Sequence, residues 1–540
     1  KNIFENYEIY FIGDIRFDED KATEDIFKKI ILNKNDNTFL RNFNSQFLII
    51  IRDLNNNNLE VVNSRFASPS VFYSYDTDNF ILSNNLYVLL KYRDFKKFSL
   101  DSHAVWHFFK FRRVFGSLTL DRNTKFLEAG SKLKFFDFKI TIQKYFKPNF
   151  KKNKFTLNEN AELLNLNLKD SINNITKNKK KISLALSGGA DTRLVLANVE
   201  KKIDCFNYTY LKNRESKTAE EVANTLNHNF IWKKIPDDVY EKNLSLSSLV
   251  NSSMYMVDGV HYSNSEFEKY DEILSGYGLD FMFQGMYLPL NKFYFKKKPL
   301  YLKILKSFDR DIINFFINNI SYKTKGFKLE NITKKNFNTE YNNELKIQLL
   351  KKLFYVSEFT DNDYDKYEYL SLSDYSRHYT HGGQLALSQM TYHSAPAFHN
   401  GLYELSNQLP LKYKFDARIT KAALKLINPK LVEIINANTG FKLKYNSAQL
   451  TLLSGVKRIF NPSKNIFHRT WLNIDEVLRK ELLFEVLKLK NSNFINEIEF
   501  IDSRAFQNFI SDWENNKVVG GQTLLLILTL NKFLESIQKY

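Results

Sequence analysis

The sequence predicts an α/β protein: a doubly wound, mostly parallel sheet with a helical C-terminal part, preceded by a β-rich N-terminal domain. Residues 1–150 contain short apolar runs separated by Asn, Asp, Ser and Gly, which is typical of antiparallel strands and turns. Residues 182–235 alternate strand-like and helical patterns, as parallel sheets do. A chain of 540 residues is too long for one core, so we expect two domains, residues 1–150 and 151–540.

Short strands dominate the first predicted domain. A helix is expected at residues 102–112, and residues 127–142 again have strand character. The strands expected before that helix lie at residues 9–12, 46–51, 59–62, 70–73 and 80–82.

The second predicted domain opens with an amphipathic helix at residues 158–177, because apolar residues recur there at helical spacing. A buried strand follows at residues 182–186 and ends at two glycines. Beyond about residue 300 the chain is rich in lysine and helical in pattern, and residues 524–530 predict a core helix. Between the strand at residues 182–186 and residue 300, we expect a helix at 194–200, a strand at 205–210, a helix at 218–226 and a strand at 230–235.

The formal net charge is +18, from 78 Lys and Arg against 60 Asp and Glu. A basic chain can bind nucleic acid by neutralising phosphates. The lysines, however, are dispersed among Asn, Ile and Phe, which favours ordinary solvated faces. We therefore do not expect nucleic acid as a partner, although a polyanionic partner stays open.

The sequence contains one cysteine, Cys205, which argues against a disulfide framework or a cysteine zinc site. No apolar run approaches the length that crosses a bilayer. We therefore expect a cytoplasmic protein without a membrane partner. His378, His381, His393 and His399 lack the spacing of a metal pair, so we expect ordinary polar or core histidines.

One motif carries chemistry, directly after the buried strand at residues 182–186 and before a helix. Its glycines let backbone amides converge, and with the helix N-terminus they form a seat for an anion such as pyrophosphate. Asp191 is a candidate Mg²⁺ ligand, because Mg²⁺ prefers one or two carboxylates plus phosphate oxygens. The alternative is a tight turn without a ligand. The candidate binding residues are Leu186, Ser187, Gly188, Gly189, Asp191 and Thr192.

The string Ser-Gly-Gly-Ala-Asp-Thr at residues 187–192 resembles the pyrophosphate loop of asparagine synthetase-like ATP-pyrophosphatases. Residues 215–226 resemble the helix after the second strand of that family, and residues 274–285 resemble its second signature. The resemblance implies an adenine-nucleotide alpha-hydrolase-like fold that uses ATP and Mg²⁺. It also implies that Ser275 and Gly276 line the nucleotide site, and that Asp280 is a second magnesium ligand facing Asp191.

The sequence departs from the family at two positions. Tyr277 stands where the family often has a glutamate, and Phe281 where a second acid follows the aspartate. Tyr277 is a candidate for proton transfer, with a packed tyrosine as the alternative. Lysines near the C-terminal part of such domains commonly meet the adenylate or pyrophosphate. The candidates are Lys421 and Lys442, with Lys444 beside them.

The first predicted domain resembles the glutaminase-like half of the same family, through residues 13–15, 43–53, 59–73 and Gly130. Active glutaminases of this class use an N-terminal cysteine, which the sequence lacks. Cys205 lies in an expected strand of the second domain and cannot replace it. We therefore expect a degenerate glutaminase-like domain that acts as a structural platform.

The resemblance implies an AMP-forming carbon–nitrogen ligase, which adenylates a carboxylate, releases pyrophosphate and transfers the acyl group to an amine or ammonia. Relatives include beta-lactam synthetases and lasso peptide cyclases. The implied partners are a small-molecule or peptide carboxylate and an amine or ammonia donor, with a separate glutaminase or precursor-binding protein as a further candidate. Two alternatives stay open: a non-catalytic nucleotide-binding scaffold and a tRNA-modifying ATP-pyrophosphatase.

Overall fold

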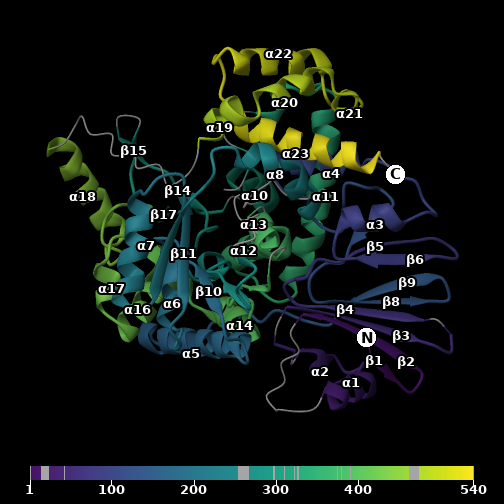
Figure 1. Cartoon of the computed structure of the whole chain (residues 1–540), viewed down its shortest axis with the longest axis horizontal. Helices are drawn as coiled ribbons and strands as arrows, with labels where there is room; N and C mark the ends of the chain where they lie inside the picture. The colour runs from purple at the N-terminus through teal and green to yellow at the C-terminus, as the bar shows by residue number, and fades with distance from the viewer. Residues whose placement is uncertain are drawn as a thin grey trace.

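The computed structural model combines a strand-rich N-terminal region, a central parallel sheet and a large helical part (Figure 1). Asp14 and Ile15, which belong to the glutaminase-like resemblance, lie outside the residues that it describes. Those residues are 2–13, 23–41, 43–44, 46–56, 58–252, 267–295, 298–308, 311–320, 323–324, 328–373, 375–378, 380–388, 391–460 and 473–538.

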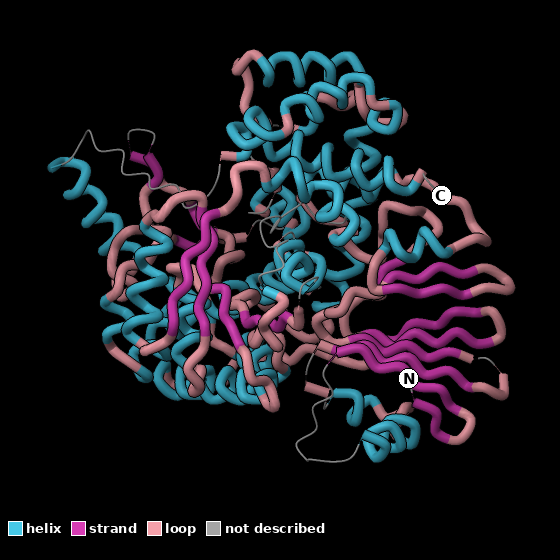
Figure 2. Tube along the Cα trace, viewed as in Figure 1, coloured by secondary structure: helices cyan, strands magenta, loops and turns pink. Residues whose placement is uncertain are grey.

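The N-terminal region is built on antiparallel strands, which confirms that it is β-rich (Figure 2). A six-stranded sheet has the order β1-β2-β3-β4-β8-β9, and a three-stranded sheet has the order β6-β5-β7. The expected strand character of residues 127–142 resolves into two strands, since Asp137 and Phe138 turn the chain with positive φ. The bounds are β1 Asn2–Phe4, β2 Tyr7–Gly13, β3 Phe47–Asp53, β4 Leu59–Asn63, β5 Phe72–Tyr75, β6 Phe80–Ser83, β7 Lys125–Phe126, β8 Ser131–Phe136 and β9 Lys139–Lys144.

A five-stranded parallel sheet follows, in the order β12-β11-β10-β13-β18. From β10 the chain adds β11 and β12 on one side and then β13 and β18 on the other. The strand order therefore reverses between β10 and β13, and in open parallel sheets such a reversal is where ligands bind, at the carboxyl ends of the strands. The bounds are β10 Ile182–Ala185, β11 Asp204–Thr209, β12 Asn229–Lys234, β13 Glu272–Leu274 and β18 His393–Ser394.

Two helices of this region begin earlier than the sequence predicts. The helix expected at residues 194–200 is α6, Ala190–Ala197, because Gly189 adopts extended backbone and serves as its N-cap. The helix expected at residues 218–226 is α7, Arg214–Thr225, where Asn213 and Ser216 form a capping box. As a result, Asp191 lies in the first turn of α6, where the helix dipole favours negative charge.

Helices bury the sheet and one another. Helix α5, Leu157–Thr176, begins at a capping box of Thr156 and Glu159. It packs against α16, Arg418–Ile427, and α14, Asn400–Gln408, and α16 also packs against α6. The strands β13 and β18 were not predicted, because three-residue and two-residue strands leave little sequence pattern.

The C-terminal helix α23, Gly521–Ile537, is the expected core helix (Figure 1). It packs against α4, Ser102–Phe111, and α8, Val239–Val250, so one hydrophobic cluster joins early and late parts of the chain. Within the described residues, no helix has the length and apolar character needed to span a bilayer.

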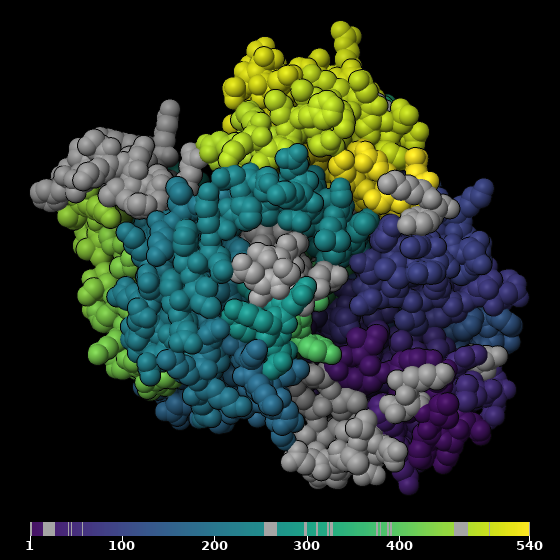
Figure 3. Space-filling view, in the orientation of Figure 1, coloured from purple at the N-terminus to yellow at the C-terminus, as the bar shows by residue number. Residues whose placement is uncertain are grey.

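The N-terminal region packs directly on the helical part (Figure 3). Phe66 stacks on Phe398 with ring centroids 4.7 Å apart, and the buried Arg65 pairs with Glu404 at 2.9 Å. Asn44 accepts the backbone N–H of Asn400 at 2.7 Å. Residues on the two sides of the predicted boundary at residue 150 therefore contact each other directly and share hydrophobic clusters, and the division into two domains stays a prediction.

Candidate functional site

The segments that follow β10 and β13 meet at the reversal of strand order. A Cβ atom on Gly276 would lie 2.7 Å from the backbone nitrogen of Thr192 and 2.9 Å from the Cβ of Asp191. Position 276 therefore accepts only glycine without displacing the start of α6. The structure thus brings together the two strings that the sequence singled out, residues 187–192 and 274–285.

Hydroxyl groups shape the loop between β10 and α6. The hydroxyl of Thr192 lies 3.1 Å from the backbone nitrogen, the carbonyl oxygen and the Oγ of Ser187. Gly189 donates its N–H to the Oγ of Ser187 at 3.2 Å. No side chain caps α6, so its first-turn amides and positive dipole end remain suited to an anion.

Asp191 and Asp280 form the electrostatic centre of the site. Burial raises the pKa of Asp191 well above its usual range, and the negative charge of Asp280 raises it further. Burial also raises the pKa of Asp280. Asp280 lies in the first turn of the short helix α9 (Leu279–Phe283), and Gln284 is the C-cap of that helix. The side-chain amide of Gln284 donates a hydrogen bond to Asp191.

This pair fits a divalent cation bound together with phosphate oxygens. Two neighbouring carboxylates in a poorly solvated site repel each other, and a cation relieves that repulsion. Across the described residues, no group of three or more His, Cys, Asp or Glu side chains forms a complete metal site. A cation held by Asp191 and Asp280 would therefore need oxygens from a substrate and water, which is the coordination Mg²⁺ prefers.

Ser275 and Tyr277 lie just after β13. The Oγ of Ser275 is 2.9 Å from the Oε1 of Gln384, on α13 (His381–Ser388). The Tyr277 ring packs in an aromatic cluster, with centroids 5.4 Å from Phe281 and 5.7 Å from Phe398. This packing favours a structural role for Tyr277 over proton transfer.

The candidate lysines divide into two groups. Lys421 donates to the carbonyl of Tyr445 at 2.8 Å, and burial lowers its pKa to about 8. Lys442 and Lys444 are half-exposed and both pair with Glu433, at 3.0 and 2.8 Å. The structure therefore assigns each of them a protein partner.

The segment that leads to Lys442 nonetheless touches the loop after β10. Ala437 donates its N–H to the carbonyl of Gly188 at 3.1 Å. A Cβ on Gly188 would lie 2.5 Å from the Cβ of Ala437, so the two backbones are in close contact. Lys442 and Lys444 therefore both lie shortly after a segment that contacts this loop, with Lys442 the nearer of the two in sequence.

Two polar residues near the site were missed by the sequence reasoning. Burial raises the pKa of Glu215, in the first turn of α7, to about 7. Asn207 on β11 donates to the carbonyl of Leu186 at 2.9 Å and to Glu215 at 3.4 Å. The sequence did offer a signal for Glu215, because an acidic residue stands at the start of the helix that follows the second strand of the parallel sheet.

His378, His381 and His399 are buried, and His393 is partly exposed, which agrees with the expectation of ordinary polar or core histidines. Burial lowers the pKa of His378 well below its usual range, and lowers the pKa values of His381 and His393 to about 3, so all three are neutral. His399 contacts Asp170 at 3.1 Å.

Cys205 is buried in β11, and burial raises the pKa of its thiol to about 12. A protonated, inaccessible thiol cannot act as a nucleophile.

Family models and curated proteins yield no match to this sequence. The resemblance of residues 187–192 and 274–285 to asparagine synthetase-like ATP-pyrophosphatases therefore stays a prediction from their residues.

Proposed function

We propose that the chain is an ATP-dependent, amide-bond-forming ligase of the AMP-forming carbon–nitrogen type. The observation that carries the proposal is the convergence of Asp191 and Asp280 beside the uncapped N-terminus of α6. This convergence lies where the strand order reverses, which also supports the adenine-nucleotide alpha-hydrolase-like fold.

In the proposed reaction, a carboxylate oxygen of the acyl substrate attacks the α-phosphorus of ATP. The bond from that phosphorus to the bridging oxygen breaks, and pyrophosphate leaves. An amine or ammonia then attacks the acyl carbon, loses a proton, and AMP departs. The loop at residues 187–192 and the first-turn amides of α6 would hold the leaving pyrophosphate.

Asp191 and Asp280 would hold Mg²⁺, which when bound supplies charge neutralisation on the phosphates. Ser275 and Gly276 would line the nucleotide site, since Gly276 already touches the start of α6. Lys442 would provide a cation for pyrophosphate after leaving Glu433, because an exposed ion pair is weak.

The nitrogen would come from outside the N-terminal region. Cys205, the one cysteine in the sequence given, is buried in β11 with a raised pKa, so it is not suited to act as a glutaminase nucleophile. The partners would then be a small-molecule or peptide carboxylate and an amine or ammonia donor.

The test is pyrophosphate release with ATP, Mg²⁺, ammonium and pooled carboxylate metabolites. Release should require all of ATP, Mg²⁺ and a carboxylate, and Asp191→Ala should abolish it. Asp361→Ala removes an exposed carboxylate and should behave as wild type. Failure of every carboxylate pool to elicit release, with ATP still bound, would exclude the ligase.

ATP binding without pyrophosphate release is the outcome expected of a non-catalytic nucleotide-binding scaffold. The packing of Tyr277 and Phe281 in one aromatic cluster favours this alternative, because the family often has acids at these positions. ATP binding that depends on Asp191 but never yields pyrophosphate would support it.

A further inference from the structure

Arg193 is a fully buried arginine two residues after Asp191 on α6. Its guanidinium donates to four backbone carbonyls. One terminal nitrogen reaches Leu431 at 2.6 Å and Ile434 at 3.3 Å, and the other reaches Ile435 at 2.8 Å and Gly188 at 3.3 Å. One side chain therefore ties residues 431–435 to the loop at residues 187–192.

Burying this cation is costly. Among the residues that the structure describes, no carboxylate pairs with the Arg193 guanidinium, and its Nε has no hydrogen-bond partner. Burial lowers the pKa of Arg193 to about 10, so the side chain stays charged at neutral pH. Carbonyl dipoles compensate the charge, and the negative charge of Glu221, which forms no ion pair with Arg193, also favours the charged form. Because a buried charge is expensive, its retention here indicates a specific role.

The contacts of Arg193 control the orientation of the loop. The Gly188 carbonyl accepts from both Arg193 and the N–H of Ala437, at 3.3 and 3.1 Å. This carbonyl oxygen is thus turned into the protein, where it cannot repel an anion at the N-terminus of α6. A second arginine, Arg214, donates to the Ala437 carbonyl at 2.6 Å and holds the same segment from the side of α7.

We propose that Arg193 is a positioning residue that latches residues 431–442 onto the loop at residues 187–192. The latch orients the Gly188 peptide for anion binding and sets the segment that carries Lys442 beside it. This inference rests on the proposed function for its catalytic consequence, while the latch itself can be measured without any turnover.

Arg193→Lys tests the latch because it keeps the charge, but one ammonium cannot reach carbonyls on both sides of the guanidinium. The turnover number for pyrophosphate release should fall roughly a hundredfold, whereas the dissociation constant for ATP should change by less than about threefold. Arg193→Met, which also removes the charge, should weaken ATP binding in addition.

Arg377→Lys is the matched control. Arg377 is also buried and donates to two backbone carbonyls, those of Gly116 and Leu118, which belong neither to the loop at residues 187–192 nor to residues 431–442. It should lower thermal stability as Arg193→Lys does, without changing the turnover number of the folded enzyme.

Amide hydrogen exchange of residues 436–442 provides the readout that is independent of activity. Arg193→Lys should accelerate exchange there roughly tenfold, and Arg377→Lys should not. Wild-type exchange and turnover in Arg193→Lys would overturn the latch. Accelerated exchange in a protein that never releases pyrophosphate would instead retain the latch and reject the proposed ligase.

Discussion

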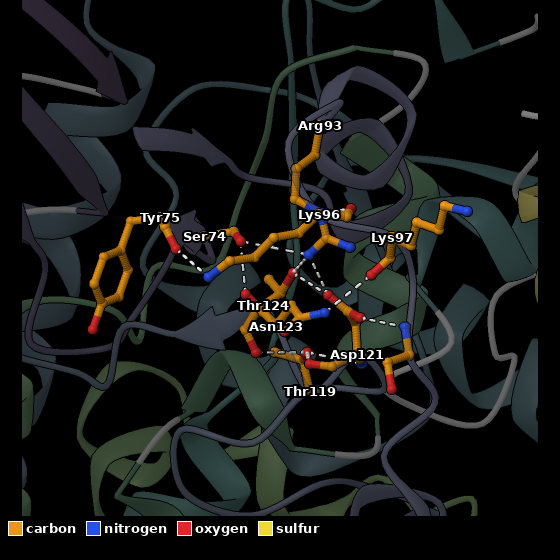
Figure 4. Close-up of polar contacts among 10 residues, drawn as sticks. Ser74, Tyr75, Arg93, Lys96, Lys97, Thr119, Asp121, Asn123 and Thr124 are labelled. Carbon is orange, nitrogen blue, oxygen red and sulfur yellow. Dashed lines mark hydrogen bonds and ion pairs between the residues drawn. The ribbon is translucent and has the colours of Figure 1, made fainter. Parts of the chain in front are cut away.

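Two charged clusters of this protein contrast in how their charges are balanced. In the N-terminal region Arg93 and Asp121 point toward each other, 2.5 Å apart, and both are buried (Figure 4). Thr124 and the backbone N–H of Ser99 complete the hydrogen bonds of the Asp121 carboxylate. At the carboxyl ends of β10 and β13, Asp191 and Asp280 instead repel each other.

The difference separates a structural cluster from a candidate site. The Arg93–Asp121 cluster is satisfied internally, so it contributes to holding the three-stranded sheet β6-β5-β7 and adjoining loops in place. Within the described residues, no cation pairs with Asp191 or Asp280, which accept hydrogen bonds from the Gln284 amide and the Phe281 N–H. Partly buried carboxylates without a paired cation, beside a helix N-terminus, are therefore the feature that marks the candidate site.

The largest expected effect is the loss of stability when Arg93 loses its counter-charge. Asp121→Asn should lower the free energy of unfolding by about 3–5 kcal/mol, because it leaves Arg93 buried without a counter-charge. Chemical denaturation measures this change. Asp94→Asn, at an exposed position, is the control and should be close to wild type. A loss as small as that of the control would mean that the cluster is not structural.

The second prediction concerns the charge repulsion between Asp191 and Asp280, which a neutral side chain at position 280 removes. Asp280→Asn should raise the melting temperature in EDTA, by about 1 °C for each kcal/mol of repulsion removed in a chain of 540 residues, while it abolishes pyrophosphate release. The asparagine oxygen can still accept the Phe281 N–H that Asp280 accepts at 2.9 Å. A destabilised variant would show that the two carboxylates do not repel each other.

The third prediction gives this repulsion a pH dependence. The folded pKa values of Asp191 and Asp280 are raised, so the folded state binds more protons than the unfolded state above about pH 4. The associated stability is complete at lower pH and is lost as pH rises through the folded pKa values. The melting-temperature advantage of Asp280→Asn should therefore grow between pH 5.5 and pH 8 in EDTA. An advantage independent of pH would contradict the assignment.

The fourth prediction concerns the close approach of Gly276 to the start of α6, which brings the segments carrying Asp191 and Asp280 together. Gly276→Ala should cost about 1–3 kcal/mol of stability and reduce pyrophosphate release, because its Cβ would meet Thr192 and Asp191. Gly455→Ala is a matched control, since nothing lies within 4 Å of its added Cβ, and it should stabilise α18, Ser447–Phe460, slightly. Denaturation and turnover of both variants measure the contrast, and equal behaviour would refute the close approach.

The smallest effect concerns the exposed ion pairs. Glu433→Gln should leave the melting temperature unchanged, because exposed pairs with Lys442 and Lys444 contribute little to stability. Lys442→Met should reduce turnover more than Lys444→Met does, since Lys442 is proposed to meet pyrophosphate. Equal turnover in the two lysine variants would remove Lys442 from the site.

Local sequence pattern predicted much of the architecture. The strands β2 to β6, β8 and β9, the helix α5, the strands β10 to β12 and the core helix α23 follow from apolar periodicity and turn residues, which depend on neighbours in the chain. The very short strands β1 and β7 were not predicted. The start of α6 was placed four residues late, because the extended conformation of Gly189 decides the cap. The short strands β13 and β18 exist through their partners in the sheet, which no local pattern reveals.

For the site, the sequence by itself determined the string at residues 187–192, which predicts an anion site, and named Asp191 and Asp280 as a pair, the latter through a resemblance. Those properties depend on residue identity and spacing along the chain. Only the tertiary structure decided that Gly276 touches Thr192, that Tyr277 packs with Phe281, and that Arg193 joins residues 431–435 to Gly188. These contacts join residues far apart in sequence, and their geometry is set by the packing of the whole sheet and its helices.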